Sequence, residues 1–184
     1  QEWTANNLNV SHFRNGDTIP EAKTKEEWLS LSSKGKPSWC YFDNDPENGK
    51  NFGKLYNWYA INDPRGLAPE GWYIPGNQDW SSLVKNLLGV DVAGLKLKST
   101  TGWKSKNGTN NIGFSALPGG YRNEKGDFKE LGTKSQWWSN SVPVEVKQTN
   151  MIYSLMLNDF SIEVSYIKVS KENGLSVRCI KDKN

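Results

Sequence analysis

One acidic stretch has the residue types of a calcium loop. Asp43, Asp45 and Glu47 place carboxylates at alternate positions ahead of Gly49, and Ca²⁺ in proteins prefers such oxygen ligands. The stretch lacks the distant bidentate Glu of an EF-hand, because position 54 is Lys. Two interpretations therefore stand, a calcium site at the three carboxylates and a plain polar turn.

The chain has two cysteines, Cys40 and Cys179. Their separation suits neither a CxxC redox pair nor a Cys-based zinc site. It allows one disulfide that joins the two ends of a secreted domain, and closing so long a loop would contribute roughly 4–5 kcal/mol. The alternative is two unrelated buried thiols.

The sequence offers little for catalysis. Its single histidine, His12, excludes paired-His chemistry, and any catalytic triad would have to include it. The chain has no nucleophile elbow, no HExxH motif and no phosphate-binding glycine loop. We interpret His12 as a surface or turn residue, and Gly119-Gly120 as a point of tight strand packing rather than an anion site. The sequence therefore predicts a protein that is not an enzyme.

Aromatic and polar side chains in the second half of the chain are typical of carbohydrate binding without calcium. Sugar rings stack on exposed aromatic rings, while polar side chains bond the hydroxyls. The candidate ligand-binding residues are Trp137, Trp138, Asn140, Tyr153, Asn158 and Tyr166. We expect one of the two adjacent tryptophans to point inwards, because neighbouring strand residues alternate faces.

A basic stretch surrounds Trp103. Lys96, Lys98, Lys104 and Lys106 would attract a sulfated or uronic polysaccharide, or would form a solvated loop. The whole chain has 23 Lys and Arg against 20 Asp and Glu, a net charge of +3. That balance is too even for a dedicated nucleic-acid binder, so we expect no nucleic-acid partner.

Length and hydropathy limit the number of domains and of membrane spans that the chain can have. The 184 residues fit a single domain over 1–184. No apolar stretch has the roughly 18–20 residues that a membrane span needs. Because the sequence opens with Gln1 rather than methionine, we expect the gene product to start earlier, and a secretory signal could have been removed.

Two helices are predicted in the first half. Thr24 and Glu27 have the spacing of a capping box, and this helix should fade near 32–35. A second helix should follow Ile74-Pro75, with a cap at Gly76 or Asn77, an apolar face that includes Trp80, Leu83, Val84, Leu87 and Leu88, and an end at Gly89.

The second half is rich in strand patterns. Residues 151–157 and 162–169 alternate polar and apolar side chains around a polar turn, which predicts a hairpin. Shorter strands are expected at 38–42 and at 175–180, after Gly174. Helices followed by antiparallel strands make an α+β domain.

Five ordered segments and the opening Gln1–Asn9 resemble one family. The segments are Gly53–Ala60, Ala68–Pro75 with Trp80, Gly113–Arg122, Trp137–Ser139 and Gly174–Cys179. In this order they resemble the Fibrobacter succinogenes major paralogous domain, which occurs in secreted and surface lipoproteins of Bacteroidota-type bacteria. The resemblance covers almost the whole chain.

The same segments are more distantly similar to the formylglycine-generating-enzyme and C-type-lectin superfamily. This resemblance implies a C-type-lectin-like fold with two helices, a small twisted antiparallel sheet and long irregular loops. It also implies neighbouring chain ends, with the N-terminal part near Cys179. The sequence departs from the family at Gly76–Asp79, where the usual cap is Thr; Gly is a tolerable cap.

The resemblance implies a secreted or surface-tethered bacterial binding module for a carbohydrate or protein ligand. Its place would be extracytoplasmic, at the outer-membrane surface or secreted, with a lipid anchor possible upstream. A structural subunit of a cell-surface assembly is the alternative, and a formylglycine-generating-like enzyme is a third. That enzyme branch holds copper with paired cysteines, a pattern that Cys40 and Cys179 do not match. No cofactor is expected beyond the possible calcium.

Overall fold

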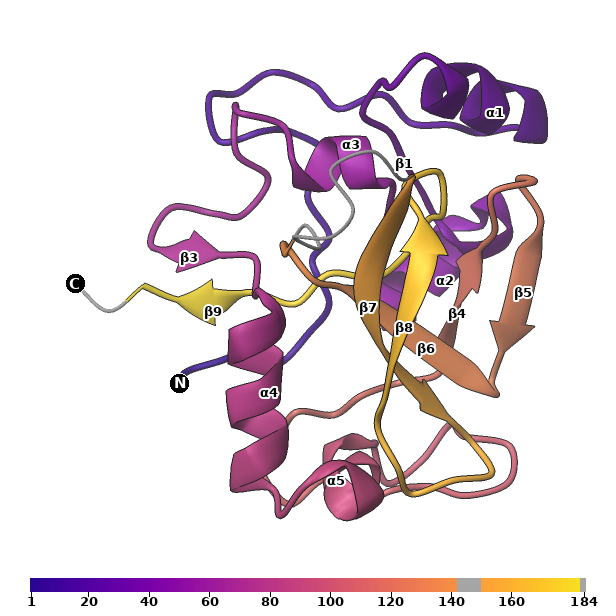
Figure 1. Cartoon of the computed structure of the whole chain (residues 1–184). Coiled ribbons are helices and arrows are strands. Elements are labelled where there is room, and N and C mark those ends of the chain that lie inside the picture. The colour runs from indigo at the N-terminus through magenta and orange to yellow at the C-terminus, as the bar shows by residue number, and fades with distance from the viewer. Residues whose placement is uncertain (142–149, 183–184) are drawn as a thin grey trace.

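The computed structural model describes residues 1–141 and 150–182 and has the α+β class that the sequence predicts (Figure 1). The helices are α1 (Lys25–Ser33), the 3-10 turn η1 (Phe42–Asn44), α2 (Pro46–Phe52), α3 (Trp58–Ile61), α4 (Asn77–Asn86) and α5 (Val90–Leu97). The strands are β1 (Trp39–Cys40), β2 (Leu55–Tyr56), β3 (Trp72–Tyr73), β4 (Gly119–Arg122), β5 (Phe128–Leu131), β6 (Lys134–Trp138), β7 (Met151–Asn158), β8 (Ser165–Ser170) and β9 (Ile180–Lys181). None of the helices in these ranges is long and apolar enough to cross a membrane.

A five-stranded sheet with the order β5-β4-β6-β7-β8 is the centre of the fold. The predicted hairpin is confirmed, because β7 pairs with β8 from Met151 opposite Ser170 to Met156 opposite Ser165. The resemblance implied an antiparallel sheet, and this is corrected at one place, since β4 and β6 run parallel through the pair Gly120 and Ser135.

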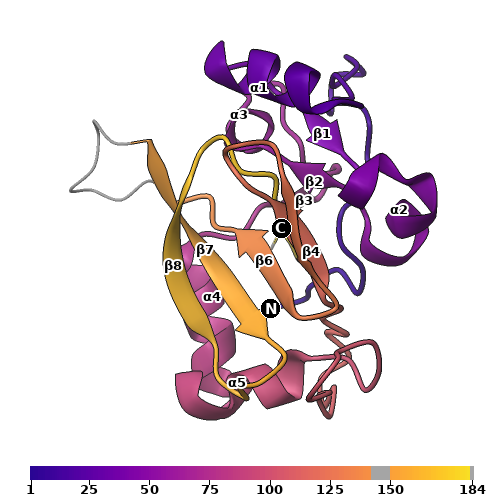
Figure 2. The same ribbon diagram turned by 90° about the vertical axis from the view of Figure 1, so that its right-hand side faces the viewer.

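Both faces of the central strands are covered. On one face Trp138, Ile152 and Val169 join a core cluster that also contains α3 and the C-terminal segment. On the other face Trp137 and Leu155 join a second cluster that contains the apolar sides of α4 and α5. Figure 2 shows α4 passing behind β7. The sheet is therefore the wall between two cores.

The two ends of the described chain lie together, as the resemblance implied. The Thr4 N–H donates to the Cys179 carbonyl at 3.0 Å, and the Leu8 N–H donates to the Val177 carbonyl at 2.9 Å. The Thr4 hydroxyl also accepts from the Cys179 N–H at 3.1 Å. These bonds give the N-terminal segment partners although it has no regular secondary structure of its own.

Both predicted helices are present with their expected starts. In α1 the Thr24 hydroxyl accepts from the Glu27 N–H at 3.1 Å, and the Glu27 carboxylate accepts from the Thr24 N–H at 3.2 Å. At α4 the Asp79 carboxylate accepts from the Gly76 N–H at 2.9 Å, which compensates for the missing cap side chain.

The expectation of only two helices is wrong, because the described residues contain five α-helices. The helix α2 begins inside the acidic stretch, with Asp45 as its cap and Pro46 at its first position. Gly89, expected to end α4, is instead the cap of α5, and α4 ends at Asn86, so Leu88, expected on its apolar face, lies outside the helix and is exposed. Helices of four to eight residues have too few turns to show a clear 3.6-residue repeat.

Two predicted strands are shorter than expected. The segment 38–42 contributes only β1, and the segment 175–180 forms isolated bridges at Leu175 and Ser176 before β9.

The prediction of tight packing at Gly119-Gly120 is confirmed. Gly120 has a φ of +65°, and a Cβ there would lie 2.5 Å from the Phe42 ring and 2.6 Å from the Lys129 carbonyl.

Four cations are buried in the loops and cores: Lys54, Lys98, Arg122 and Arg178. Among the described residues, no carboxylate oxygen lies within 4.0 Å of any of them. Each donates to backbone carbonyls and lies over an aromatic ring instead. Burial lowers the pKa of the Arg178 guanidinium to about 9, so this group keeps its charge at pH 7.

The solvated-loop interpretation is wrong for one residue of the basic stretch, Lys98. It is fully buried, and its Nζ donates to the carbonyls of Lys106, Asn158 and Ser161 at 2.9, 3.0 and 2.8 Å. Burial lowers the pKa of this ammonium. The side chain thus joins the loop after α5 to the β7–β8 connection, while Lys104 and Lys106 are exposed.

The expected disulfide is not formed. Cys40 and Cys179 are free thiols that belong to different core clusters, so the alternative of two unrelated buried thiols is the one the structure shows. Burial raises the pKa of each thiol to about 12.

Replacing Lys98 with Met should lower the free energy of unfolding by about 2–4 kcal/mol, because the three carbonyls it serves lose their donor. Urea denaturation of the purified chain measures this change. Lys106→Met is the matched control on the same loop and should change the value by less than about 0.5 kcal/mol. Equal effects of the two substitutions would contradict the role given to Lys98.

The folded chain should react very slowly with a thiol-specific disulfide reagent at pH 8, since both thiols are covered and remain protonated there. In denaturant, Cys40 and Cys179 should both react at once. A denatured, unreduced chain in which neither thiol reacts would show that the disulfide exists.

Candidate functional site

A hollow of about 560 Å³ lies over one face of the five-stranded sheet. Its wall comes from β4, β6, β7 and β8, from the β4–β5 turn and from the turn that follows β8. Its lining includes Tyr121, Glu124, Lys134, Gln136, Met156 and Asn173. This volume falls in the range of about 300–1,000 Å³ that is typical of small-molecule sites.

Two amide side chains distinguish this hollow. Gln136 and Asn173 are only 3% and 5% exposed. No hydrogen bond joins the side-chain oxygen of either residue to any part of the described chain. Buried polar groups without a partner are uncommon in native proteins and call for a water or a ligand.

The fold places these amides by strand register and by a turn. Gln136 lies opposite Met156 in the β6–β7 ladder, on the same face as Trp138 two positions later. Asn173 ends the turn after β8, where its N–H donates to the Ser170 carbonyl at 3.0 Å. The next residue, Gly174, pairs with Arg122 of β4, which brings Asn173 beside the sheet.

The surroundings of the amides are mixed in character but balanced in charge. Met156 and Ile167 supply a half-buried apolar surface. Lys134 lies 3.7 Å from Glu130 and over the Tyr121 ring at 5.8 Å. Burial, with help from Glu130 and Glu124, raises the pKa of Tyr121, so its phenol is a neutral donor at pH 7. The arrangement can bind polar groups but pairs no nucleophile with a base.

Trp137 and Trp138 do not form an exposed aromatic surface, and the expectation that only one of them points inwards is wrong. Both are fully buried. They do alternate faces, but each face of β6 carries its own core cluster. The Trp138 indole donates to the Tyr56 carbonyl at 2.7 Å, and the Trp137 indole donates to the Asn7 side-chain oxygen at 2.8 Å.

The other predicted ligand residues are scattered. Tyr153 and Tyr166 lie on the face of β7 and β8 that carries Leu155, opposite the hollow. Asn158 is buried, and its side chain accepts from the Ser161 N–H at 2.9 Å. Asn140 is exposed and lines a separate hollow of about 240 Å³. The structure does not bring the six residues together.

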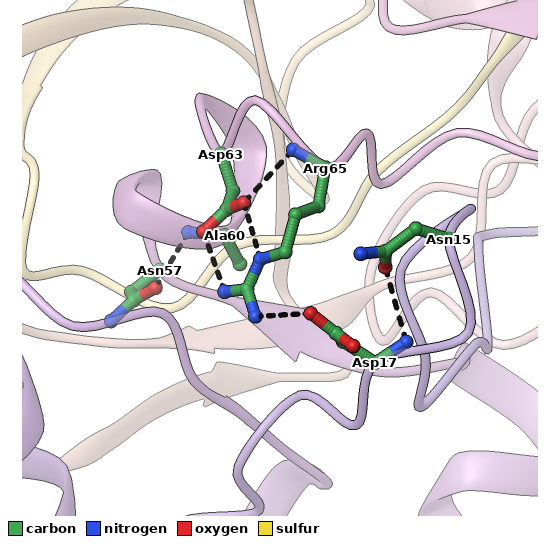
Figure 3. Close-up of polar contacts among 6 residues, drawn as sticks. All are labelled: Asn15, Asp17, Asn57, Ala60, Asp63 and Arg65. Carbon is green, nitrogen blue, oxygen red and sulfur yellow. Dashed lines mark hydrogen bonds and ion pairs between the residues drawn. The ribbon is translucent and has the colours of Figure 1, made fainter.

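That second hollow is bordered by a charged network, which Figure 3 shows. The Arg65 guanidinium donates to both oxygens of Asp63 at 2.8 and 2.9 Å and to Asp17 at 3.1 Å. These bonds lower the pKa of Asp63. Arg14, on the same wall, donates to the carbonyls of Ala68 and Trp72. Because these groups already have partners, the network explains how loops are joined rather than how a ligand binds.

The acidic stretch has local partners as well. The Asp45 carboxylate caps α2 by accepting from the Glu47 N–H at 2.9 Å, and Glu47 forms an ion pair with Lys50 at 2.6 Å. Asp43 is exposed. In the part of the chain that the structure describes, no three His, Cys, Asp or Glu side chains are close enough to hold a metal ion. Calcium binding at Asp43, Asp45 and Glu47 stays a prediction.

His12 is exposed, and its backbone forms an isolated bridge with Thr18, as expected of a turn residue.

Sequence patterns did not indicate the residues of the sheet hollow. The one available signal was Gln136 itself, a polar residue directly before two tryptophans in a strand pattern. Nothing local pointed to Asn173, because its place depends on the pairing of Gly174 with β4.

A family model described as the Fibrobacter succinogenes major domain matches residues 1–181. No curated protein and no solved structure matches the chain.

Proposed function

The chain belongs to the Fibrobacter succinogenes major domain family, and we propose that it is a secreted or surface-tethered bacterial binding module with a C-type-lectin-like fold. The paired chain ends, the capped helices α1 and α4 and the long loops support the fold proposal. The module acts outside the cytoplasm and captures a carbohydrate or a protein ligand without catalysis.

The observation that carries this proposal is the pair of buried amides in the sheet hollow. Gln136 and Asn173 have no hydrogen-bond partner for their side-chain oxygens among the described residues. Leaving such groups unpaired costs about 1–3 kcal/mol each. A ligand in the hollow removes this cost when each amide turns its covered oxygen towards it, so the hollow is better suited to binding than to stability alone.

A structural subunit of a cell-surface assembly is the second candidate, and a different surface favours it. Leu88 and Phe160 are 78% and 77% exposed. They lie in the α4–α5 and β7–β8 connections, near a hydrogen bond in which the Val164 N–H donates to the Val90 carbonyl at 2.8 Å. A contiguous exposed apolar patch is typical of contacts with a partner chain, and these two side chains would have to belong to one.

A glycan array on the purified chain, run with calcium and again with chelator, tests the binding proposal. We expect selective retention of a few glycans in both conditions. Loss in chelator would support calcium at Asp43, Asp45 and Glu47. Tyr166→Ala is a control on the sheet face opposite the hollow. If the hollow is the site, this variant should bind the same glycans as the parent chain.

A blank array in both conditions would contradict a carbohydrate ligand. The same chain would then be used to capture partners from outer-membrane extracts. If no protein is retained selectively either, the binding-module proposal is wrong.

A further inference from the structure

We infer that the sheet hollow binds one neutral sugar unit of a glycan, with the Gln136 and Asn173 amides bonding its hydroxyls and Tyr121 and Met156 contacting its apolar face. This inference rests on the proposed function and deepens it by naming the site and the ligand class.

The amides are suited to hydroxyl groups. A sugar hydroxyl both donates and accepts, and a carboxamide offers one acceptor and two donors. The terminal torsions of Gln and Asn are broad, so each amide can turn its oxygen or its nitrogen towards the hollow. The other amide of the wall, Asn123, differs because its oxygen already accepts from the N–H groups of Lys125 and Asp127.

The charges of the hollow favour a neutral ligand. Lys134 already faces Glu130 at 3.7 Å, and the wall adds one further charge of each sign, Lys168 and Glu124, so the charges around the hollow balance. An anionic ligand would meet these carboxylates, and a cationic ligand would have to compete with Lys134. The groups nearest the covered floor, Gln136 and Asn173, carry no charge.

The placement of the hollow favours a sugar over an extended peptide. A peptide that adds a strand binds an unpaired sheet edge through backbone groups. The hollow reaches the edge strand β8, but the Gln136 amide lies on β6, which is already paired with β4 and β7, so a peptide added at the edge would not cover it. A sugar ring needs only side-chain partners and a flat apolar contact, which Tyr121 and Met156 supply.

The test uses the ¹⁵N-labelled full chain titrated with methyl glycosides of glucose, galactose, mannose and N-acetylglucosamine. We expect at least one glycoside to shift the side-chain NH₂ resonances of Gln136 and Asn173 in a saturable way. Glucuronic acid and an N-acetylated dipeptide amide, run in parallel, should leave these resonances unchanged.

Three variants separate binding from folding. Gln136→Met and Asn173→Leu remove an unpartnered amide, so each should weaken the best glycoside at least tenfold while Gln136→Met keeps or raises the melting temperature. Ser154→Ala is the matched control, since its hydroxyl is also buried without a partner in the described chain but does not line the hollow. It should bind like the parent.

Three results would overturn the inference. If no glycoside shifts the two amides, the hollow is not a sugar site, and the module proposal then depends on the search for a protein ligand. If a glycan binds but both amide variants bind it as the parent does, the module proposal stands and the site lies elsewhere. A response to the dipeptide alone would make the ligand a peptide.

Discussion

Hydrogen bonds from buried cations to loop carbonyls are the constraint on which this fold depends. Much of the chain lies outside helices and strands, and its covered backbone groups still need partners. Arg122 alone serves the carbonyls of Gly126, Ala22 and Thr24 while lying between the rings of Trp28 and Phe128. Arg178 does the same for the N-terminal segment through the Thr4 carbonyl and the Asn7 side chain. These side chains supply hydrogen-bond donors to the loop carbonyls, as the backbone N–H groups of neighbouring strands do in a sheet.

One of these residues, Arg122, is also tied to the candidate site through its backbone. The Arg122 N–H donates to the Gly174 carbonyl at 2.9 Å, and the Gly174 N–H donates to the Arg122 carbonyl at 2.8 Å. Arg122 directly follows Tyr121, and Gly174 directly follows Asn173. Arg122 therefore fixes the segment before α1 through its guanidinium and joins two walls of the hollow through its backbone. A rigid wall reduces the conformational entropy that is lost when a weakly bound small ligand orders its site.

Local patterns predicted the parts of the structure that have local causes. The α1 capping box, the apolar face of α4 and the β7–β8 hairpin follow from residues close together in the sequence. The errors come from contacts between distant segments. Trp137 and Trp138 are both buried because a second core covers the other face of β6, and Lys98 is buried because a distant hairpin brings carbonyls to it. The hollow was missed for the same reason.

Hydrogen exchange of the arginine side-chain Nε–H groups tests the central claim most directly. Arg122 donates its Nε–H to the Gly126 carbonyl at 3.0 Å, and Arg178 donates its Nε–H to Asn7 at 2.8 Å, both at buried positions. If the buried cations hold the loops, these two protons exchange as slowly as the best protected backbone amides, while the Nε–H proton of the partly exposed Arg65 exchanges much faster. Equal, fast exchange at all three would show that the buried cations do not hold the loops.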